Sequence, residues 1–276
     1  MTGLATAMIV AGAMGAACAA LSVFVVLRRW AFIGEGIAHA GFGGAGTAWM
    51  LSLLVSASFM HPAAVYAVAV AFCFAVATGI AIVTRRQQVH TDTAIGIFLV
   101  ASLAWGFVAY GIYRHVRQGL DPTAWGDYLL GQMTLLTPQF AVAAVLTSAV
   151  VLLTLGALNK EIIAYCFDPN LAEVSGVRVG FVHYLLVLLV TLMIIIGMRL
   201  MGSLLITALL VLPGATALLL ARRFGSVMAC SIGVGLIGAL AGPLINDRWR
   251  FIPEGPAIVL ALVVQFVVAY LWRRFR

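Results

Sequence analysis

Charged residues are scarce in this sequence. Asp, Glu, Lys and Arg make up 9% of its 276 residues, while 64% are hydrophobic. The mean hydropathy of +1.13 is far above that of soluble domains, which need mixed charge on their surface. This shortage of charge excludes a soluble globular protein and predicts an all-α, polytopic membrane protein. The net charge of +7 fits basic residues retained on the cytoplasmic side of a membrane, so we expect membrane lipid, and no nucleic acid, as a partner.

Motifs that bind ATP or a catalytic metal are also absent. Lysine occurs once, at Lys160, and the sequence holds no GxxxxGK[ST] loop and no HExxH helix. The four cysteines stand singly without a CxxC pair, so neither a zinc knuckle nor a disulfide framework is implied. If transport is driven by ATP, another chain must bind it, and we expect no tightly bound cofactor. The first apolar run lacks the basic start of a signal peptide and is expected to remain as a span.

Long apolar runs divide the chain into candidate spans. A hydrocarbon core of about 30 Å needs roughly 20 helical residues, and charged or turn-forming residues mark the ends of runs of that size. We expect about nine transmembrane helices, with eight or ten as alternatives. The runs cover 4–27, 31–56, 62–84, 93–113, 139–158, 180–197, 201–221, 225–245 and 256–272. No linker or soluble domain interrupts them, so we treat 1–276 as a single transmembrane domain.

The basic residues predict the orientation of these spans. Eleven of them fall at one set of span ends, namely Arg28, Arg29, Arg85, Arg86, Lys160, Arg178, Arg222, Arg223, Arg273, Arg274 and Arg276. The other ends hold five: Arg114, Arg117, Arg199, Arg248 and Arg250. Because positive residues are retained in the cytoplasm, this asymmetry places the amino terminus outside and the carboxyl terminus inside.

Glu35 and His39 are the most informative residues in the chain. They lie four residues apart in the second apolar run, so both side chains leave the same face of one helix. An ionisable group at membrane depth costs about 2.5–3.5 kcal/mol even on gentle scales, which favours a role in a pathway. A carboxylate and an imidazole suit borderline divalent ions such as zinc, manganese and ferrous iron. The spacing leaves two interpretations open, a metal-ligand pair or a polar pair bonded within the bundle.

Two ligands do not hold a metal by themselves. A symmetric dimer that brings two copies of this helix together would supply two Glu and two His around one axis. Small residues surround the pair and predict either close helix packing or a broken, pathway-lining segment. These residues are Gly34, Gly36, Ala38, Ala40, Gly41, Gly43, Gly44 and Gly46.

Other polar residues in or near the spans have simpler explanations. His183 is alone in its apolar run and is expected to form hydrogen bonds within the bundle. Asp247 and Glu254 flank the external side of the last span. They are candidates for a cation-attracting external mouth, with solvated loop charges as the alternative.

Two loops are long enough to have a structure of their own. The external segment 114–138 mixes charged, aromatic and turn-forming residues and predicts short helices on the membrane surface. The cytoplasmic segment 159–179, NKEIIAYCFDPNLAEVSGVRV, predicts a short exposed helix. Asp168 is placed to cap that helix, Pro169 to start it and Gly176 to end it.

Several runs, taken together and in order, resemble a known family. LRRWAFIGEGIAHAGFGGAG, TDTAIGIFLVASLAWG, DYLLGQMTLLTP, FDPNLAEVSGV, RLMGSLLITALLVLPGATALLLARRF and PEGPAIVL are spread from about residue 20 to 262. They resemble the zinc, manganese and iron permeases of bacterial ABC importers, in which the second span typically reads RR-x-AFIGD-x-x-SHA.

The resemblance implies a permease bundle in the bacterial inner membrane that carries no catalytic activity itself. It implies a dimer of permease subunits that works with cytoplasmic ATPase subunits and an extracytoplasmic metal-binding protein. The family's intramembrane metal residues correspond to Glu35 and His39, and its ATPase-coupling residues to Phe167, Asp168, Pro169, Ala172 and Gly176. Glu35 stands where the family usually has Asp, Ala38 replaces Ser, and GFGG follows His39 in place of a leucine, proline, glycine turn. The transported metal and the choice between homodimer and heterodimer are therefore left open.

Three functions remain to be compared. The first is an ATP-driven importer of zinc, manganese or iron that passes the ion through Glu35 and His39. The second is a stand-alone secondary cation transporter, which would need no cytoplasmic docking helix. The third is an intramembrane metalloenzyme, which is disfavoured because no further ligand motif or catalytic base accompanies the pair.

Overall fold

The described part of the chain is helical. The computed structural model describes residues 2–54, 61–85, 90–117, 138–249 and 251–275, and in these ranges it contains helices and no strand. The helices are α1 (Thr2–Leu27), α2 (Ile33–Leu54), α3 (Pro62–Arg85), α4 (Thr91–Arg117), α6 (Pro138–Ala157), α7 (Asn159–Phe167), α8 (Pro169–Val174), α9 (Val179–Met201), α10 (Ser203–Leu209), α11 (Leu212–Leu220), α12 (Phe224–Arg248) and α13 (Glu254–Arg274). The all-α class is confirmed. Most of the external segment 114–138 lies outside the described residues.

Seven of these helices are long and apolar enough to cross a membrane: α1, α3, α4, α6, α9, α12 and α13. The expected count of about nine spans is therefore not confirmed. The α2 helix has the length of a span at 22 residues, but its glycines and its ionisable pair lower its apolar character.

The apolar run 201–221 is divided by two backbone breaks. Gly202 has φ +84°, a left-handed conformation that glycine adopts without steric cost, and it separates α9 from α10. Pro213 follows the first residue of α11, and the carbonyl four residues before it belongs to Leu209, where α10 ends. Because a proline ring clashes with that carbonyl and offers no N–H, the helix cannot continue through this point. The run therefore forms two short helices in place of one span.

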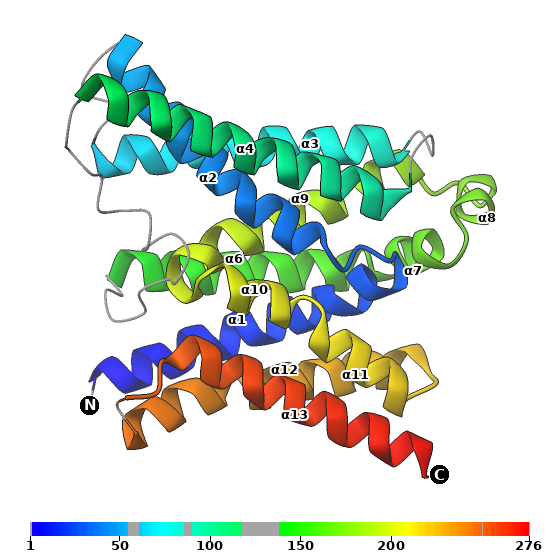
Figure 1. Ribbon diagram of the computed structural model, residues 1–276. Coiled ribbons are helices and arrows are strands. Elements are labelled where there is room, and N and C mark those ends of the chain that lie inside the picture. The colour runs from blue at the N-terminus through cyan, green and yellow to red at the C-terminus, as the bar shows by residue number, and fades with distance from the viewer. Residues whose placement is uncertain (1, 55–60, 86–89, 118–137, 250, 276) are drawn as a thin grey trace.

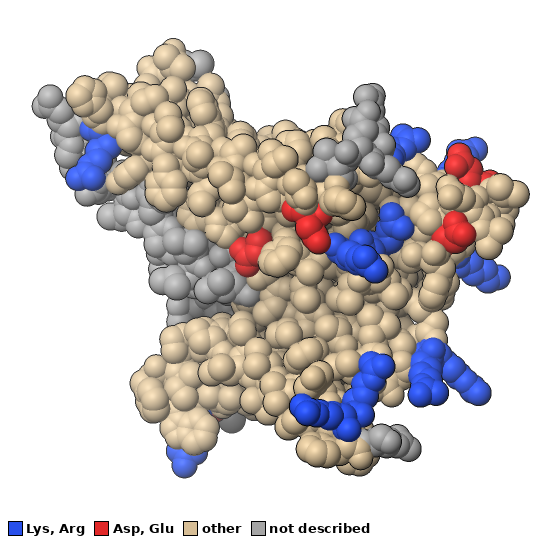
Figure 2. Space-filling model, turned by 45° about the vertical axis from the view of Figure 1, so that its right-hand side comes forward, with Lys and Arg blue, Asp and Glu red and all other residues tan. Residues whose placement is uncertain are grey.

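The long helices lie side by side in one bundle (Figure 1). The two termini lie at opposite ends of this bundle, and α7 and α8 lie at the end that holds the carboxyl terminus (Figure 1). Most of the visible basic side chains also gather toward that end, on the right of Figure 2. This distribution matches the asymmetry on which the predicted orientation depends.

Close packing explains the glycines of α2. A Cβ built on Gly44 would lie 2.4 Å from the Cα of Ala69 in α3, and one on Gly46 would lie 3.0 Å from the carbonyl oxygen of Gly106 in α4. The helix runs without interruption from Ile33 to Leu54, so the alternative of a broken segment is wrong. The small residues let α3 and α4 approach α2, which holds the ionisable pair at a fixed position.

Candidate metal site and the segment 159–179

Glu35 and His39 meet on one face of α2, as their spacing predicts. The Nδ1 atom of His39 lies 3.2 Å from Oε2 of Glu35 and 2.9 Å from the backbone oxygen of the same residue. A carbonyl oxygen accepts hydrogen bonds and never donates them, so Nδ1 carries a proton. In the neutral ring the lone pair is then on Nε2, which has no hydrogen-bond partner within the described ranges. That atom is available to a metal ion.

Thr207 of α10 completes the surroundings of the carboxylate. Its hydroxyl donates a hydrogen bond of 3.0 Å to Oε1 of Glu35. The close approach of the two helices depends on Gly34, where a Cβ would lie 2.9 Å from Cγ2 of Thr207. Both carboxylate oxygens are thus bonded, one by α2 itself and one by a helix far along the sequence.

The pair is open to the surface of this single chain. The side chains of His39 and Glu35 are 23% and 27% exposed, whereas most of the small residues around them are buried. In the part of the chain that the structure describes, no group of three or more His, Cys, Asp or Glu residues is arranged to hold a metal ion. The role of Glu35 and His39 as metal ligands stays a prediction, and one chain supplies two of the side chains that such a site would need.

The segment 159–179 folds as its caps predict. The Oδ1 atom of Asp168 accepts hydrogen bonds from the backbone N–H groups of Asn170 at 2.9 Å and Leu171 at 3.1 Å. Pro169 occupies the first position of α8, and Gly176 follows the helix with φ +86°. The N-cap, the initial proline and the terminal glycine are all confirmed.

One side of this segment is apolar and uncovered. Leu171 and Val174, three residues apart on α8, are 65% and 87% exposed, and Phe167 at the end of α7 is 69% exposed. Ala172, between them in sequence, is buried toward the bundle at 2% exposure. Exposed apolar residues on two short consecutive helices at one end of a bundle are typical of a surface that a partner covers.

The segment is linked to the spans by a polar network beside a cavity of about 600 Å³. The hydroxyl of Tyr165 in α7 donates a hydrogen bond of 2.7 Å to Nδ1 of His183 in α9. Nε2 of His183 in turn donates one of 3.0 Å to the carbonyl oxygen of Ala81 in α3. The predicted bonding of His183 within the bundle is confirmed.

Arg28 at the end of α1 packs against the same network. Its guanidinium lies 4.3 Å from the centre of the Tyr165 ring, a cation–π geometry. Burial raises the pKa of Tyr165 to about 12, so the phenol keeps its proton and remains a donor. Four helices therefore meet at one polar contact next to the segment 159–179.

Asp247 and Glu254 lie at the facing ends of α12 and α13. Asp247 is exposed, and Glu254 is partly buried with its Oε2 atom unbonded. Among the described residues, no hydrogen bond or ion pair joins the two carboxylates to each other or to Glu35 and His39. Their role as an external mouth stays a prediction.

Comparison with known proteins identifies the family. The model of the ABC 3 transport family matches residues 1–273, which is nearly the whole chain. The chain belongs to the ABC 3 transport family. Its relatives in this family include a chelated iron transport system membrane protein, YfeD, of Yersinia pestis. That protein is 32% identical over 271 residues, which cover 98% of this chain and 85% of YfeD.

Further ABC 3 relatives agree in sequence and structure. The manganese transport system membrane protein MntC of Listeria monocytogenes is 28% identical, over 98% of this chain and 90% of MntC. A chain in the structure of PsaBC from Streptococcus pneumoniae in complex with Fab is 27% identical and superimposes with a TM-score of 0.77. That similarity covers 98% of this chain and 91% of the other. The resemblance of the quoted runs to this kind of permease is confirmed.

Sequence reasoning missed two features of this family member. Thr207 lies inside the run RLMGSLLITALLVLPGATALLLARRF, which carried part of the resemblance, but its spacing to Glu35 gives no sign of contact. The bond between Tyr165 and His183 likewise joins residues from separate helices. Hydrogen bonds of this kind depend on tertiary packing, which local patterns do not encode.

Proposed function

We propose that this chain is the transmembrane permease subunit of an ATP-driven importer of a divalent metal ion. The observation that carries the proposal is the partly exposed pair of Glu35 and His39 on α2. The carboxylate of this pair accepts hydrogen bonds, and the Nε2 atom of His39 is available to an ion. Iron and manganese, named for the relatives YfeD and MntC, are ions that such ligands bind. The transported ion is the substrate, and the chain itself carries out no chemical reaction.

A second permease subunit completes the site. Two α2 helices related by a two-fold axis contribute two carboxylates and two imidazoles, enough for four-coordinate binding of one ion. An importer needs transient binding, strong enough to admit the ion and weak enough to release it. Side chains that are already paired with each other suit this purpose, because the ion must displace the Glu35–His39 contact to be held by both.

The cytoplasmic segment 159–179 couples the permease to an ATPase subunit. The exposed apolar side chains of Phe167, Leu171 and Val174 are the groups that would contact a hydrophobic groove on this partner. The sequence has no P-loop of its own, so ATP is bound by the partner chain. Movement of this segment reaches α3 and α9 through the hydrogen bonds of Tyr165 and His183. Rocking of these helices exchanges outward and inward access to the ion.

The remaining partners follow from the orientation. We place the amino terminus outside and the carboxyl terminus in the cytoplasm of a bacterial inner membrane, as the loop charges favour. An extracytoplasmic binding protein then delivers the ion at the end where α12 and α13 meet, near Asp247 and Glu254. On this proposal residues 1–276 act as one permease domain.

Purification with its co-expressed partners tests the proposed function. The complex is expected to contain an ATPase subunit and to hydrolyse ATP faster when the loaded binding protein and a divalent metal are added. An ATP hydrolysis rate that is unchanged by manganese, iron and zinc would contradict the proposal. Metal transport by the chain alone in liposomes, driven by a proton gradient, would instead support the secondary transporter.

A further inference from the structure

The structure contains a groove between α11, α12 and α13 that the proposed function does not use. The helices α12 and α13 cross near one end, where a Cβ on Gly242 would lie 2.3 Å from Cγ1 of Ile258. They diverge toward the end that holds the carboxyl terminus (Figure 1), and α11 contributes Thr216 and Leu220 to the lining of the groove. The groove has a volume of about 380 Å³.

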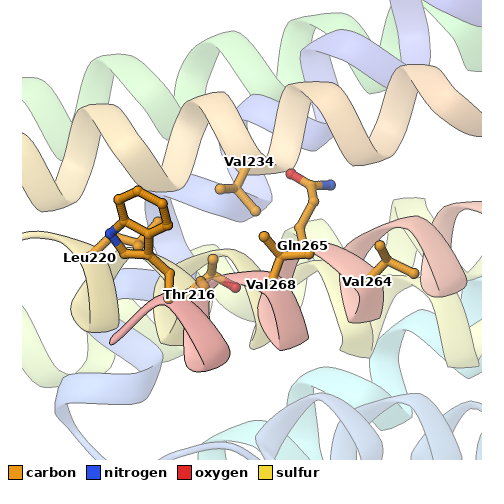
Figure 3. Close-up of a pocket in the computed structure, with 8 residues that line it drawn as sticks. Thr216, Leu220, Val234, Val264, Gln265 and Val268 are labelled. Atoms are coloured by element: carbon orange, nitrogen blue, oxygen red, sulfur yellow. The ribbon is translucent and has the colours of Figure 1, made fainter. Parts of the chain in front are cut away.

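The walls of the groove are apolar. They include Leu220 of α11, Val234 of α12, and Val264, Val268 and Trp272 of α13 (Figure 3). The two polar residues in the lining are bonded to their own helices. Thr216 donates to the carbonyl oxygen of Leu212 at 2.7 Å, and Gln265 donates to that of Ala261 at 3.3 Å. The surface therefore suits a hydrocarbon chain better than a polar ligand.

The length and exposure of the groove fit one leaflet of a bilayer. Val264 and Trp272 are eight residues apart, which corresponds to about 12 Å along the helix, and half of the hydrocarbon core measures about 15 Å. Val264, Val268 and Trp272 are 59%, 59% and 64% exposed, so the groove opens toward the surroundings of the chain. Trp272 lies at the shallow end, where tryptophan is favoured at the membrane interface.

Four arginines lie close in sequence to the lining residues Leu220 and Trp272. Arg222 and Arg223 connect α11 to α12, two residues after Leu220, and Arg273 and Arg274 directly follow Trp272. All four side chains are exposed, and within the described ranges none forms an ion pair with a carboxylate. Uncompensated basic groups at the edge of a membrane attract anionic headgroups.

We propose that this groove binds an anionic phospholipid. One acyl chain lies between α12 and α13 against α11, and the phosphate lies between the two arginine pairs. In the proposed orientation the lipid belongs to the cytoplasmic leaflet. The groove is separate from Glu35 and His39, so a test of lipid binding does not depend on the outcome at the proposed metal site.

Quenching of Trp272 fluorescence tests the proposal. The full chain is reconstituted with a trace of brominated phosphatidylglycerol or of brominated phosphatidylcholine, each in vesicles of unlabelled phosphatidylcholine. The contribution of Trp272 is the difference between wild type and Trp272→Phe. We expect quenching by the anionic lipid at roughly tenfold lower mole fraction than by the zwitterionic lipid, in line with the avidity gained from a basic cluster. Equal quenching by both lipids would overturn the proposal.

Two sets of variants separate the headgroup from the chain. Replacement of Arg222, Arg223, Arg273 and Arg274 by Gln is expected to abolish the preference for the anionic lipid. The matched control is Arg178→Gln with Lys160→Gln, two basic residues at the same end but away from the groove, and it should keep the preference. Val268→Cys tests whether a second copy of the chain, and not a lipid, occupies the groove. Disulfide formation between two copies at this position would show that a second chain covers the groove, and it would overturn the lipid site.

Discussion

His39 contributes one nitrogen to its own helix and leaves the other available. This division depends on the carbonyl oxygen of Glu35, which fixes the proton on Nδ1. The carboxylate of Glu35 is positioned by His39 on one side and Thr207 on the other. At the scale of single residues, the proposed site is therefore one imidazole and one carboxylate held by a neighbour from α10.

Thr207→Val tests that positioning. The substitution keeps the branched shape but removes the hydroxyl that donates to Oε1 of Glu35. We expect about tenfold weaker apparent affinity for the transported metal, because partners that orient a ligand usually carry an effect of that size. The measurement is the metal dependence of ATPase activity in the assembled complex. Thr207→Ser, which keeps the hydroxyl, is the matched control, and an equal loss in both variants would assign the effect to packing.

Among the helices, α2 depends on close approach to its neighbours. Gly44→Ala places a methyl group 2.4 Å from the backbone of Ala69, where only movement of a helix relieves the contact. We expect a loss of about 1–3 kcal/mol, as for overpacked cores, and a lower melting temperature in detergent.

Gly96→Ala in α4 is the control, because a Cβ there meets nothing within 4 Å. It is expected to leave stability unchanged or to raise it by up to about 1 kcal/mol, since alanine favours a helix over glycine. A Gly44→Ala protein as stable as wild type would show that the α2–α3 contact is not tight.

The α8 helix depends on its cap. Asp168→Ala removes the acceptor for two backbone N–H groups and is expected to cost about 1 kcal/mol of local helix stability. Because the proposed ATPase docking face is carried by this short helix, metal-stimulated ATP hydrolysis should fall while metal binding persists. Asp168→Asn keeps the cap and should retain activity. If Asn fails as Ala does, the charge of Asp168 matters more than its capping.

At the scale of the whole molecule, the orientation in the membrane can be measured directly. Val174 and Phe251 are 87% and 81% exposed, and they lie at opposite ends of the bundle. With the native cysteines replaced, Val174→Cys should react with a membrane-impermeant maleimide only in inverted vesicles. Phe251→Cys should react from the outside of spheroplasts. The reverse pattern would contradict the proposed orientation.

Much of this architecture was predictable, because apolar runs and the charged or turn-forming residues at their ends determine locally where helices begin and end. The runs 4–27 and 62–84 correspond closely to α1 (Thr2–Leu27) and α3 (Pro62–Arg85). The division of 201–221 was missed, although Pro213 is visible in the sequence, because continuous hydropathy outweighed one helix-breaking residue. For the site, spacing alone brought Glu35 and His39 together, since a helical turn is a local property. Thr207 could not be found in this way, because its contact depends on how α10 packs against α2.

The central claim is that a divalent metal crosses the membrane by way of His39 and Glu35. The most direct test is ATP-driven uptake of radioactive manganese(II) into proteoliposomes that contain the permease, its ATPase subunit and the binding protein. His39→Ala should lower uptake at least about tenfold, because it removes the Nε2 ligand from each subunit, while the complex still assembles. Normal uptake by a stably assembled His39→Ala complex would contradict the account.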